Sequence, residues 1–301
     1  MSIALKLEGV SKTYNDFQAV KNLSFSVKTG SICGFLGHNG AGKTSTLRMI
    51  LGLTAPTAGH IEVLGSTGQK VLDRIGFLPE ERGLYRKMKA IDTIVFFAGL
   101  KGIKASVARA RGIELLEAQG LGPFIYKQVG TLSKGMQQKV QLISALVHKP
   151  EFVILDEPFS GLDPVNQQGL ENLIKSLAHE GATVLFSTHI MQHAERLCEN
   201  IVMLTKGEKV FEGTVKEARA KAPRFLELEG SLNALQIATV VGIKSIFNTG
   251  PDHYSCELDM GANPLDVLKI LLKSGLDIQG FEAKEPSLHE AFMVLTGDHN
   301  A

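Results

Sequence analysis

The chain has 301 residues, of which 44% are hydrophobic and 21% are charged, and its formal net charge is +1. This is the composition of a globular protein, and the length suggests one large domain plus a smaller one. A net charge near zero gives no long-range field that would concentrate nucleic acid, so we expect no nucleic-acid partner. The three cysteines are far apart and odd in number, which indicates neither a disulfide framework nor a zinc site and fits a reducing compartment.

No segment predicts export or insertion of the chain itself. The N-terminal residues MSIALKLEGV lack the basic region, apolar stretch and cleavage site of a secretory signal. No apolar run approaches the roughly 18 to 20 residues that cross a bilayer. We therefore expect no direct membrane span, and we expect any membrane role to come through a partner.

Strand-like and helical segments alternate up to about residue 190. Residues 3–65 contain the β-rich runs IALKLEGV, NLSFSVK, SICGFLG and HIEVLG, with the helical segment TSTLRMILGL after a glycine-rich loop. Three amphipathic segments then predict a helical subdomain at about residues 85–149. Strand signals resume at EFVILDEP and ATVLFSTH, with the helical stretch QQGLENLIKSLAHEG between them. This alternation predicts an α/β fold with a mainly parallel sheet.

The composition changes at the charged run KEARAKAPRF, which predicts a boundary between a domain at residues 1–220 and a second domain at residues 221–301. The second part reads as strand, helix, two strands, helix, strand and a last helix. This order predicts a small α+β, ferredoxin-like domain of the βαββαβ type with an extra helix.

A phosphate-binding loop is the strongest motif. GHNGAGKT fits the pattern GxxxxGK[ST], after a strand and at the start of a helix. Glycines let the backbone N–H groups point at phosphates, and the helix N-terminus adds a positive dipole end. An ordinary glycine-rich turn is the alternative, and the strand–loop–helix context disfavours it. We expect the loop to bind ATP through Gly37, His38, Asn39, Gly40, Ala41, Gly42, Lys43, Thr44 and Ser45.

Within this loop, Lys43 is expected to reach the β- and γ-phosphates, Thr44 to ligate Mg²⁺ and Ser45 to touch the α-phosphate. The apolar strand FVILDEP ends in two acids at the sheet edge where ligands of α/β proteins bind. We expect Asp156 to hold Mg²⁺ through water and Glu157 to accept a proton from the attacking water. A solvated strand end is the alternative for these two carboxylates.

Further motifs surround the acidic strand. LSKGM, with Ser133 and Gly135, comes before it, and SGLD and the His189 of FSTH follow it. Together with GHNGAGKT and VILDEP, these segments resemble the ATP-binding cassette (ABC) family in order and spacing, over residues 1 to about 220. The fold expected from this resemblance is a P-loop NTPase core of the ABC ATPase type. The ending LHEAF resembles the C-terminal extension of ATPases from bacterial export, drug efflux or sodium efflux systems.

The resemblance implies roles for particular residues. Tyr14 would stack on adenine, for which a surface aromatic in a turn is the alternative. Ser133 and Gly135 would contact the γ-phosphate bound by a second copy, and His189 would contact the γ-phosphate and hold Glu157 in place. The implied protein is an ATP-hydrolysing homodimer that powers a separate transmembrane permease, as an exporter, from the cytoplasmic face of the cell membrane. A cassette ATPase not coupled to transport and a P-loop kinase or GTPase are the rival functions.

Several positions depart from the family pattern or allow a second interpretation. Glu80 stands where the family has a glutamine; its carboxylate can ligate Mg²⁺ but cannot donate a hydrogen bond to phosphate. Met136 replaces the usual glutamine of the signature. His193 lies four residues after His189, which allows a zinc site, although no glutamate lies between them as in a metalloprotease helix. The basic run RGLYRKMKA is either a solvated loop or a permease contact, and the C-terminal domain is either a structural cap or a regulatory and dimerisation unit.

Overall fold

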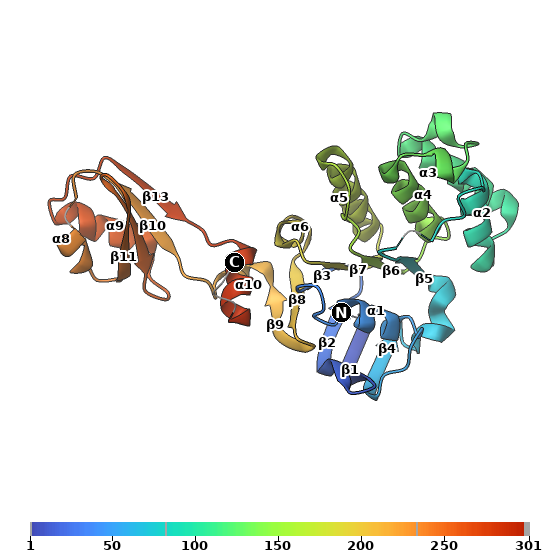
Figure 1. The fold of residues 1–301 in the computed structure, drawn as a ribbon, viewed down its shortest axis with the longest axis horizontal. Coiled ribbons are helices and arrows are strands. Elements are labelled where there is room, and N and C mark those ends of the chain that lie inside the picture. The colour runs from blue at the N-terminus through green and yellow to red at the C-terminus, as the bar shows by residue number, and fades with distance from the viewer. Residues whose placement is uncertain (1, 82, 233, 298–301) are drawn as a thin grey trace. The chain divides into compact units, whose positions relative to one another are not determined.

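A computed structural model describes residues 2–81, 83–232 and 234–297, which form two compact units, Met1–Val215 and Lys216–Ala301. Each unit has its own sheet structure (Figure 1). The predicted boundary at residue 220 rested on the charged run. Part of that run forms a short helix, α7 (Val215–Arg219), nearly all of which belongs to the second unit.

The first unit contains two sheets. Its strands are β1 (Ile3–Tyr14), β2 (Phe17–Lys28), β3 (Ile32–Leu36), β4 (Ala58–Val63), β5 (Ile75–Leu78), β6 (Phe152–Asp156), β7 (Thr183–Thr188), β8 (Asn200–Thr205) and β9 (Glu208–Thr214). Six of these strands form one sheet in the order β5-β6-β7-β3-β8-β9, parallel except for β9. The prediction of an α/β fold with a mainly parallel sheet is confirmed. Strands β2, β1 and β4 form a separate antiparallel sheet.

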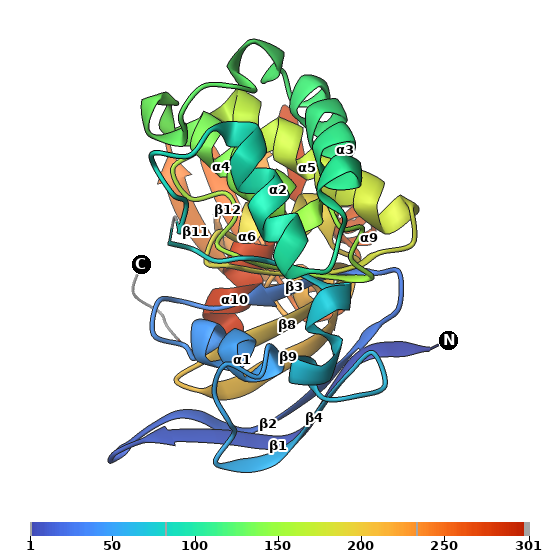
Figure 2. The same cartoon turned by 90° about the vertical axis from the view of Figure 1, so that its right-hand side faces the viewer.

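Helices cover both faces of the parallel sheet. They are α1 (Lys43–Ile50), α2 (Ala90–Leu100), α3 (Ala105–Ala118), α4 (Lys134–Leu146), α5 (Pro164–His179) and α6 (Met191–Leu197). Helix α1 contacts β2, β4 and β6 and therefore lies between the two sheets, while α5 and α6 contact β3 and β7 on the other face (Figure 1). Figure 2 shows α2, α3 and α4 grouped together as a helical part of this unit.

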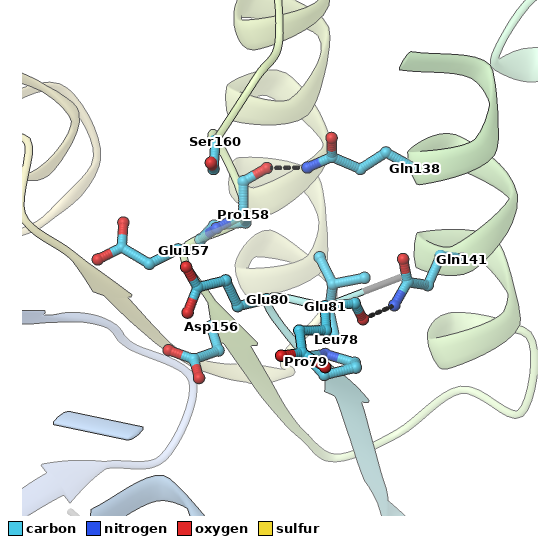
Figure 3. A pocket seen from close by; sticks show the side chains of 10 residues that line it. All are labelled: Leu78, Pro79, Glu80, Glu81, Gln138, Gln141, Asp156, Glu157, Pro158 and Ser160. Carbon is cyan, nitrogen blue, oxygen red and sulfur yellow. Dashed lines mark hydrogen bonds between the residues drawn. The ribbon is translucent and has the colours of Figure 1, made fainter. Parts of the chain in front are cut away.

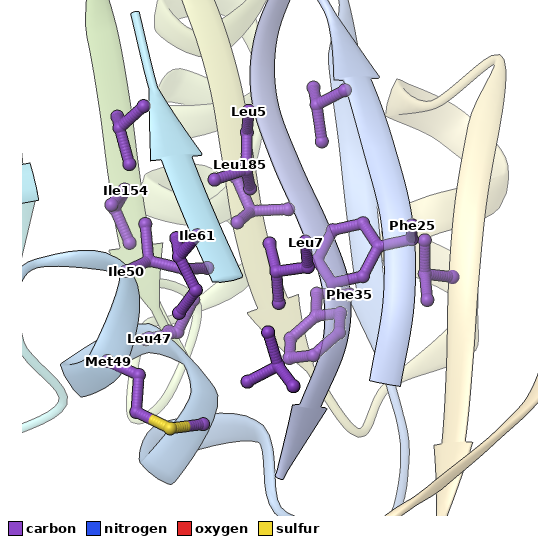
Figure 4. Close-up of a cluster of buried hydrophobic side chains, with 14 of the residues drawn as sticks. Leu5, Leu7, Phe25, Phe35, Leu47, Met49, Ile50, Ile61, Ile154 and Leu185 are labelled. Carbon is purple, nitrogen blue, oxygen red and sulfur yellow. The ribbon is translucent and has the colours of Figure 1, made fainter. Parts of the chain in front are cut away.

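The core of the first unit lies between the two sheets and includes the inner face of α1 (Figure 4). Phe25 of β2 stacks on Phe35 of β3, with ring centroids 5.4 Å apart. Fully burying one such side chain contributes about 1.5–3 kcal/mol. This packing fixes β3 and α1, and so fixes the loop that joins them. Other core members are Leu5, Leu7, Leu47, Ile50, Ile61, Ile154 and Leu185.

Helices α2, α3 and α4 pack around a second, smaller core. The side chains that they bury share the three- and four-residue spacing seen in the sequence. Its members include Ile91, Ile94, Ala108, Leu116, Val140, Ile143 and Val147. No helix in the described part of the chain is long and apolar enough to cross a membrane.

The second unit has the predicted ferredoxin-like topology. Its elements are β10 (Phe225–Glu229), α8 (Ala234–Ala238), β11 (Ile243–Gly250), β12 (His253–Leu258), α9 (Pro264–Lys273), β13 (Gly280–Lys284) and α10 (Leu288–Thr296). The strand order is β11-β12-β10-β13, with every pairing antiparallel. The prediction of a βαββαβ order followed by an extra helix is confirmed. Its core includes Leu226, Leu228, Ile237, Cys256, Val267 and Leu271.

All three cysteines are buried as free thiols in the described structure. Burial raises the pKa of the Cys33 thiol to about 12 and that of Cys256 to about 11. Burial also raises the pKa of Cys198 well above its usual value. These thiols are therefore protonated at neutral pH.

Candidate functional site

The glycine-rich loop, the two acids Asp156 and Glu157, and His189 lie at the carboxyl ends of three adjacent strands. Strand β3 leads into the glycine-rich loop, β6 ends at Asp156, and β7 leads to His189. Because parallel strands end at the same edge of a sheet, the topology places these groups side by side. This edge is where ligands bind in open α/β folds.

The loop between β3 and α1 has a backbone that only glycine allows at its last position. Gly42 has φ 99°, and a Cβ atom there would lie 2.5 Å from the carbonyl oxygen of Ala19. Gly42 is also the N-cap of α1, and no side chain caps the helix. The first N–H groups of α1 are therefore oriented toward the loop, as in an anion site.

Lys43 is buried at the mouth of this loop. Its Nζ donates hydrogen bonds to the carbonyl oxygens of Gly37 at 2.7 Å and His38 at 3.3 Å, and it lies 3.4 Å from Oε1 of Glu157. A cavity of about 340 Å³ opens here. It is lined by Phe17, Ala19, His38, Asn39, Gly40, Ala41, Gly42, Lys43, Thr44, Ser45, Glu80 and Glu157.

Asp156 is 3% exposed and is held by hydroxyl groups. The Ser187 Oγ donates a hydrogen bond of 2.5 Å to its Oδ1, and the Thr44 hydroxyl also bonds to it. Burial raises the pKa of the Asp156 carboxyl, and the two hydroxyl hydrogen bonds act in the opposite direction. A carboxylate beside a hydroxyl suits a hard cation such as Mg²⁺. The described residues contain no group of three or more His, Cys, Asp or Glu side chains that could hold a metal ion.

Glu157 adopts an uncommon backbone conformation. Its φ is +46°, which costs about 1–3 kcal/mol for a non-glycine residue. Its N–H bonds to both the carbonyl oxygen and the Oγ of Ser187, at 3.2 and 3.1 Å. Oε2 lies 3.0 Å from Nδ1 of His189. Oε1 is buried without a hydrogen bond in the described structure, although the Lys43 ammonium is nearby, so this oxygen can still accept a proton or a hydrogen bond.

A second cavity, of about 360 Å³, has Asp156 and Glu157 among its lining residues (Figure 3). Glu80 lines both cavities, and in Figure 3 its carboxylate points toward Asp156 and Glu157. Glu80 was predicted as a metal ligand, but the glutamines near it were not part of the predicted site. Two glutamines of α4 reach into this region: Gln138 donates to the carbonyl oxygen of Pro158, and Gln141 donates to that of Glu81 at 3.2 Å. Their three-residue spacing on a predicted helix was the available signal.

Ser133 and Gly135, of the segment LSKGM, lie at the start of α4. Ser133 is the N-cap of α4, where its Oγ accepts a 3.3 Å hydrogen bond from the N–H of Met136. Gly135 faces α5, since a Cβ atom there would lie 3.3 Å from Nδ2 of Asn166. Neither Ser133 nor Gly135 is among the described residues that line the two cavities.

Phe17 lines the loop cavity, and Tyr14, the residue predicted to stack on adenine, is not among the described residues that line it. Tyr14 and Phe17 face each other across the tight turn between β1 and β2, where Asn15 has φ 50°. Tyr14 is 41% exposed, with the Lys12 ammonium 5.0 Å from its ring centroid. Phe17 is 66% exposed and lines the loop cavity. Phe17 was not among the predicted site residues, although its place opposite Tyr14 in a two-residue turn was a usable signal.

The sequence also allowed a zinc site at His193 and a permease contact at the basic run RGLYRKMKA. His193 is buried and contacts Glu171, and the described residues show no metal-binding group around it. In the basic run, Arg82 lies outside the described residues. Tyr85 packs edge-on against Phe96, with ring centroids 5.5 Å apart.

The pattern of the ABC transporter family matches residues 20–160, and that of the C-terminal domain of DrrA1-3-like ATP-binding proteins matches residues 213–296. The uncharacterized ABC transporter ATP-binding protein YhaQ of Bacillus subtilis is 41% identical over 297 residues, which cover 97% of this chain and 98% of that protein. The chain belongs to the ABC transporter ATP-binding proteins. This match confirms the resemblance inferred from the motifs. Members of the ABC ATPase family bind and hydrolyse ATP.

Two further comparisons agree with this family. The Nod factor export ATP-binding protein I of Burkholderia orbicola is 39% identical over 218 residues, which cover 71% of this chain and 72% of that protein. A solved structure described as the ATP-binding subunit of an ABC transporter superposes with a TM-score of 0.67 at 30% identity, over 72% of this chain and 92% of that one. The P-loop NTPase fold of the ABC ATPase type is thereby confirmed.

The position of Phe17 yields a prediction about nucleotide affinity. Phe17→Ala should weaken ATP binding by about tenfold, because an aromatic face that stacks on a base contributes about 1–3 kcal/mol. Titration with a fluorescent ATP analogue measures this, with Tyr14→Ala in parallel. Phe247→Ala, which removes an exposed aromatic of the second unit, is the matched control and should bind normally. Unchanged affinity in Phe17→Ala together with a loss in Tyr14→Ala would assign the base contact to Tyr14 alone.

Proposed function

We propose that this chain is the ATP-hydrolysing subunit of an ABC exporter whose permease is a separate membrane-spanning chain. The carboxylate of Glu157, placed between Lys43 and His189 beside the phosphate loop, is the observation that carries the proposal. In this role Glu157 accepts the proton of the attacking water, Lys43 binds the β- and γ-phosphates, and His189 orients Glu157 and contacts the γ-phosphate.

Thr44 and Asp156 are the residues that would hold Mg²⁺, with Glu80 as a further carboxylate. The ion supplies charge neutralisation for the phosphates. The remaining loop residues bind ATP through their N–H groups, while Tyr14 and Phe17 flank the base. The hydrogen bonds of Ser187 and Thr44 to Asp156 support this assignment because they orient the carboxylate before ligand arrives.

Replacing the base should separate ATP binding from hydrolysis. Glu157→Gln should retain ATP affinity and lose hydrolysis by about 10²- to 10⁴-fold, because an amide cannot accept the proton from water. Phosphate release and nucleotide titration measure the two properties. Glu180→Gln, at the C-terminal end of α5, is a matched control and should hydrolyse ATP normally. Near-normal turnover in Glu157→Gln would remove Glu157 from the role of base.

We further propose that the working unit is a homodimer in which Ser133 and Gly135 of one copy complete the phosphate site of the other. Their separation from both cavities within one chain supports this arrangement. A two-fold axis would give two equivalent composite sites, each with the loop of one copy and the α4 N-terminus of its partner.

Mixing two inactive variants tests the shared site. Lys43→Ala and Ser133→Arg should each abolish hydrolysis, yet their mixture should recover activity, up to about a quarter of the wild-type rate, because mixed dimers contain one intact composite site. Phosphate release after mixing and re-equilibration measures this recovery. The double variant Lys43→Ala/Ser133→Arg mixed with either single variant is the control and forms no intact site. Absence of recovery in dimers shown to have exchanged would contradict a composite site.

Transport itself requires a second chain. No helix of the described structure could span a membrane, and the relative named for Nod factor export supports an export role. We place the chain on the cytoplasmic face of the membrane, bound to its permease. The loop at Tyr85 is one candidate contact, and the second unit is an accessory domain of regulatory or dimerisation function.

Purification from membranes tests the coupling. The tagged full chain should bring a polytopic membrane protein with it, and ATP hydrolysis by the complex in vesicles should depend on that protein. Mass spectrometry identifies the companion, and phosphate release from the vesicles measures dependence. Full hydrolysis with no membrane-embedded companion would instead favour a cassette ATPase that is not coupled to transport.

A further inference from the structure

His193 is a buried histidine that the proposed hydrolysis does not use. It lies on α6, four residues after His189, and is 2% exposed. Its ring stacks face to face on the ring of Phe159, with centroids 3.9 Å apart and an interplanar angle of 13°. Phe159 is two residues after Glu157, so the His193 ring contacts the segment that carries the proposed base. The same ring belongs to α6, the helix that follows His189.

The edge of the same ring is polar and is held by two other charged groups. Nδ1 of His193 lies 3.1 Å from Nη2 of Arg196 and 3.3 Å from Oε1 of Glu171. Arg196 also pairs with Glu171 at 2.9 Å. Burial lowers the pKa of His193 and the Arg196 charge acts in the same direction, whereas the hydrogen bond with Glu171 raises it. The same ring nitrogen faces both members of the Arg196–Glu171 ion pair.

This packing matters because the chain at Glu157 needs support. Glu157 has a positive φ and begins a turn in which its carbonyl oxygen accepts the N–H of Ser160. Phe159 is the buried apolar residue of that turn and is 2% exposed. Its ring stacks on His193 and packs edge-to-face with Phe186, with ring centroids 5.9 Å apart. A residue held in a sparsely populated conformation persists only when its surroundings fix it.

We propose that His193 is a positioning residue that fixes the Glu157 turn relative to His189 through its stack on Phe159, while the Arg196–Glu171 ion pair anchors α6 to α5. The stack holds the turn from α6, and Glu171 holds α6 against α5. Asp163, the N-cap of α5, belongs to the SGLD segment that follows the same turn. His193 thus links the Glu157 turn, α5 and the His189 segment. The proposal rests on the proposed function, because positioning Glu157 matters only if Glu157 and His189 act in hydrolysis.

Steady-state kinetics of full-length variants test the proposal. His193→Ala should lower kcat by about 10- to 100-fold, while KM for ATP changes by less than about threefold, because a misplaced base affects the chemical step more than binding. His193→Phe keeps a flat ring against Phe159 and should restore kcat to within about threefold of wild type. The double variant His193→Ala/Phe159→Ala should be about as impaired as the worse single variant, since both remove one contact.

His148→Phe is the matched control. His148 is a second buried histidine of the same unit, and its Nε2 bonds to the carbonyl oxygen of Ile75, at the opposite end of β5 from Glu80. This variant should keep wild-type kcat. A kcat of His193→Ala within twofold of wild type, or a His193→Phe variant no better than Ala, would overturn the proposal. Glu157→Gln in the same assay separates the cases: if it still hydrolyses ATP the proposed function fails, and if it alone is inactive only the role of His193 fails.

Discussion

The site depends on one serine that ties two strand ends together. Ser187, near the end of β7, bonds through its hydroxyl to Asp156 and to the N–H of Glu157, and its carbonyl oxygen accepts from that same N–H. These bonds orient Asp156 toward the phosphate loop and hold Glu157 in its left-handed conformation. The strain at Glu157 is thus balanced by hydrogen bonds that a parallel sheet supplies at low cost, because neighbouring strands end at the same edge.

Buried charge is arranged so that few groups are left without compensation. Lys43 is satisfied by loop carbonyls and Glu157, and Asp156 is satisfied by hydroxyl groups. Isolated buried charges are strongly unfavourable, so this mutual pairing permits a cluster of titratable groups inside the fold. Three buried side-chain atoms of the described structure lack a hydrogen bond, namely Gln138 Oε1, His148 Nδ1 and Glu157 Oε1, and Glu157 Oε1 lies 3.4 Å from the Lys43 ammonium. A carboxylate oxygen that accepts no hydrogen bond can accept a proton from a bound water.

The phosphate loop, the mainly parallel sheet and the ferredoxin-like second unit could be predicted from the sequence. The loop follows from glycine-specific backbone geometry, and the strands and helices of both units follow from local periodicity. The sequence could not predict which of two aromatics lines the cavity. Tyr14 and Phe17 pair across a tight turn, and which of them lines the cavity depends on how that turn packs against the rest of the unit. The Phe159–His193 stack was also out of reach, because it joins segments brought together only by tertiary packing. In the sequence, His193 suggested metal chemistry; in the structure its neighbours are an aromatic ring, a carboxylate and a guanidinium.

The burial of the native thiols has a practical consequence. With thiol pKa values of about 12 and about 11, Cys33 and Cys256 carry a thiolate fraction of about one in ten thousand or less at pH 7. Thiol-directed reagents act on the exposed thiolate, so the unmodified chain is a nearly silent background for site-specific labelling. A single cysteine placed on an exposed position of α5 can then carry a fluorescent or spin probe without first replacing the core residues that hold each unit together.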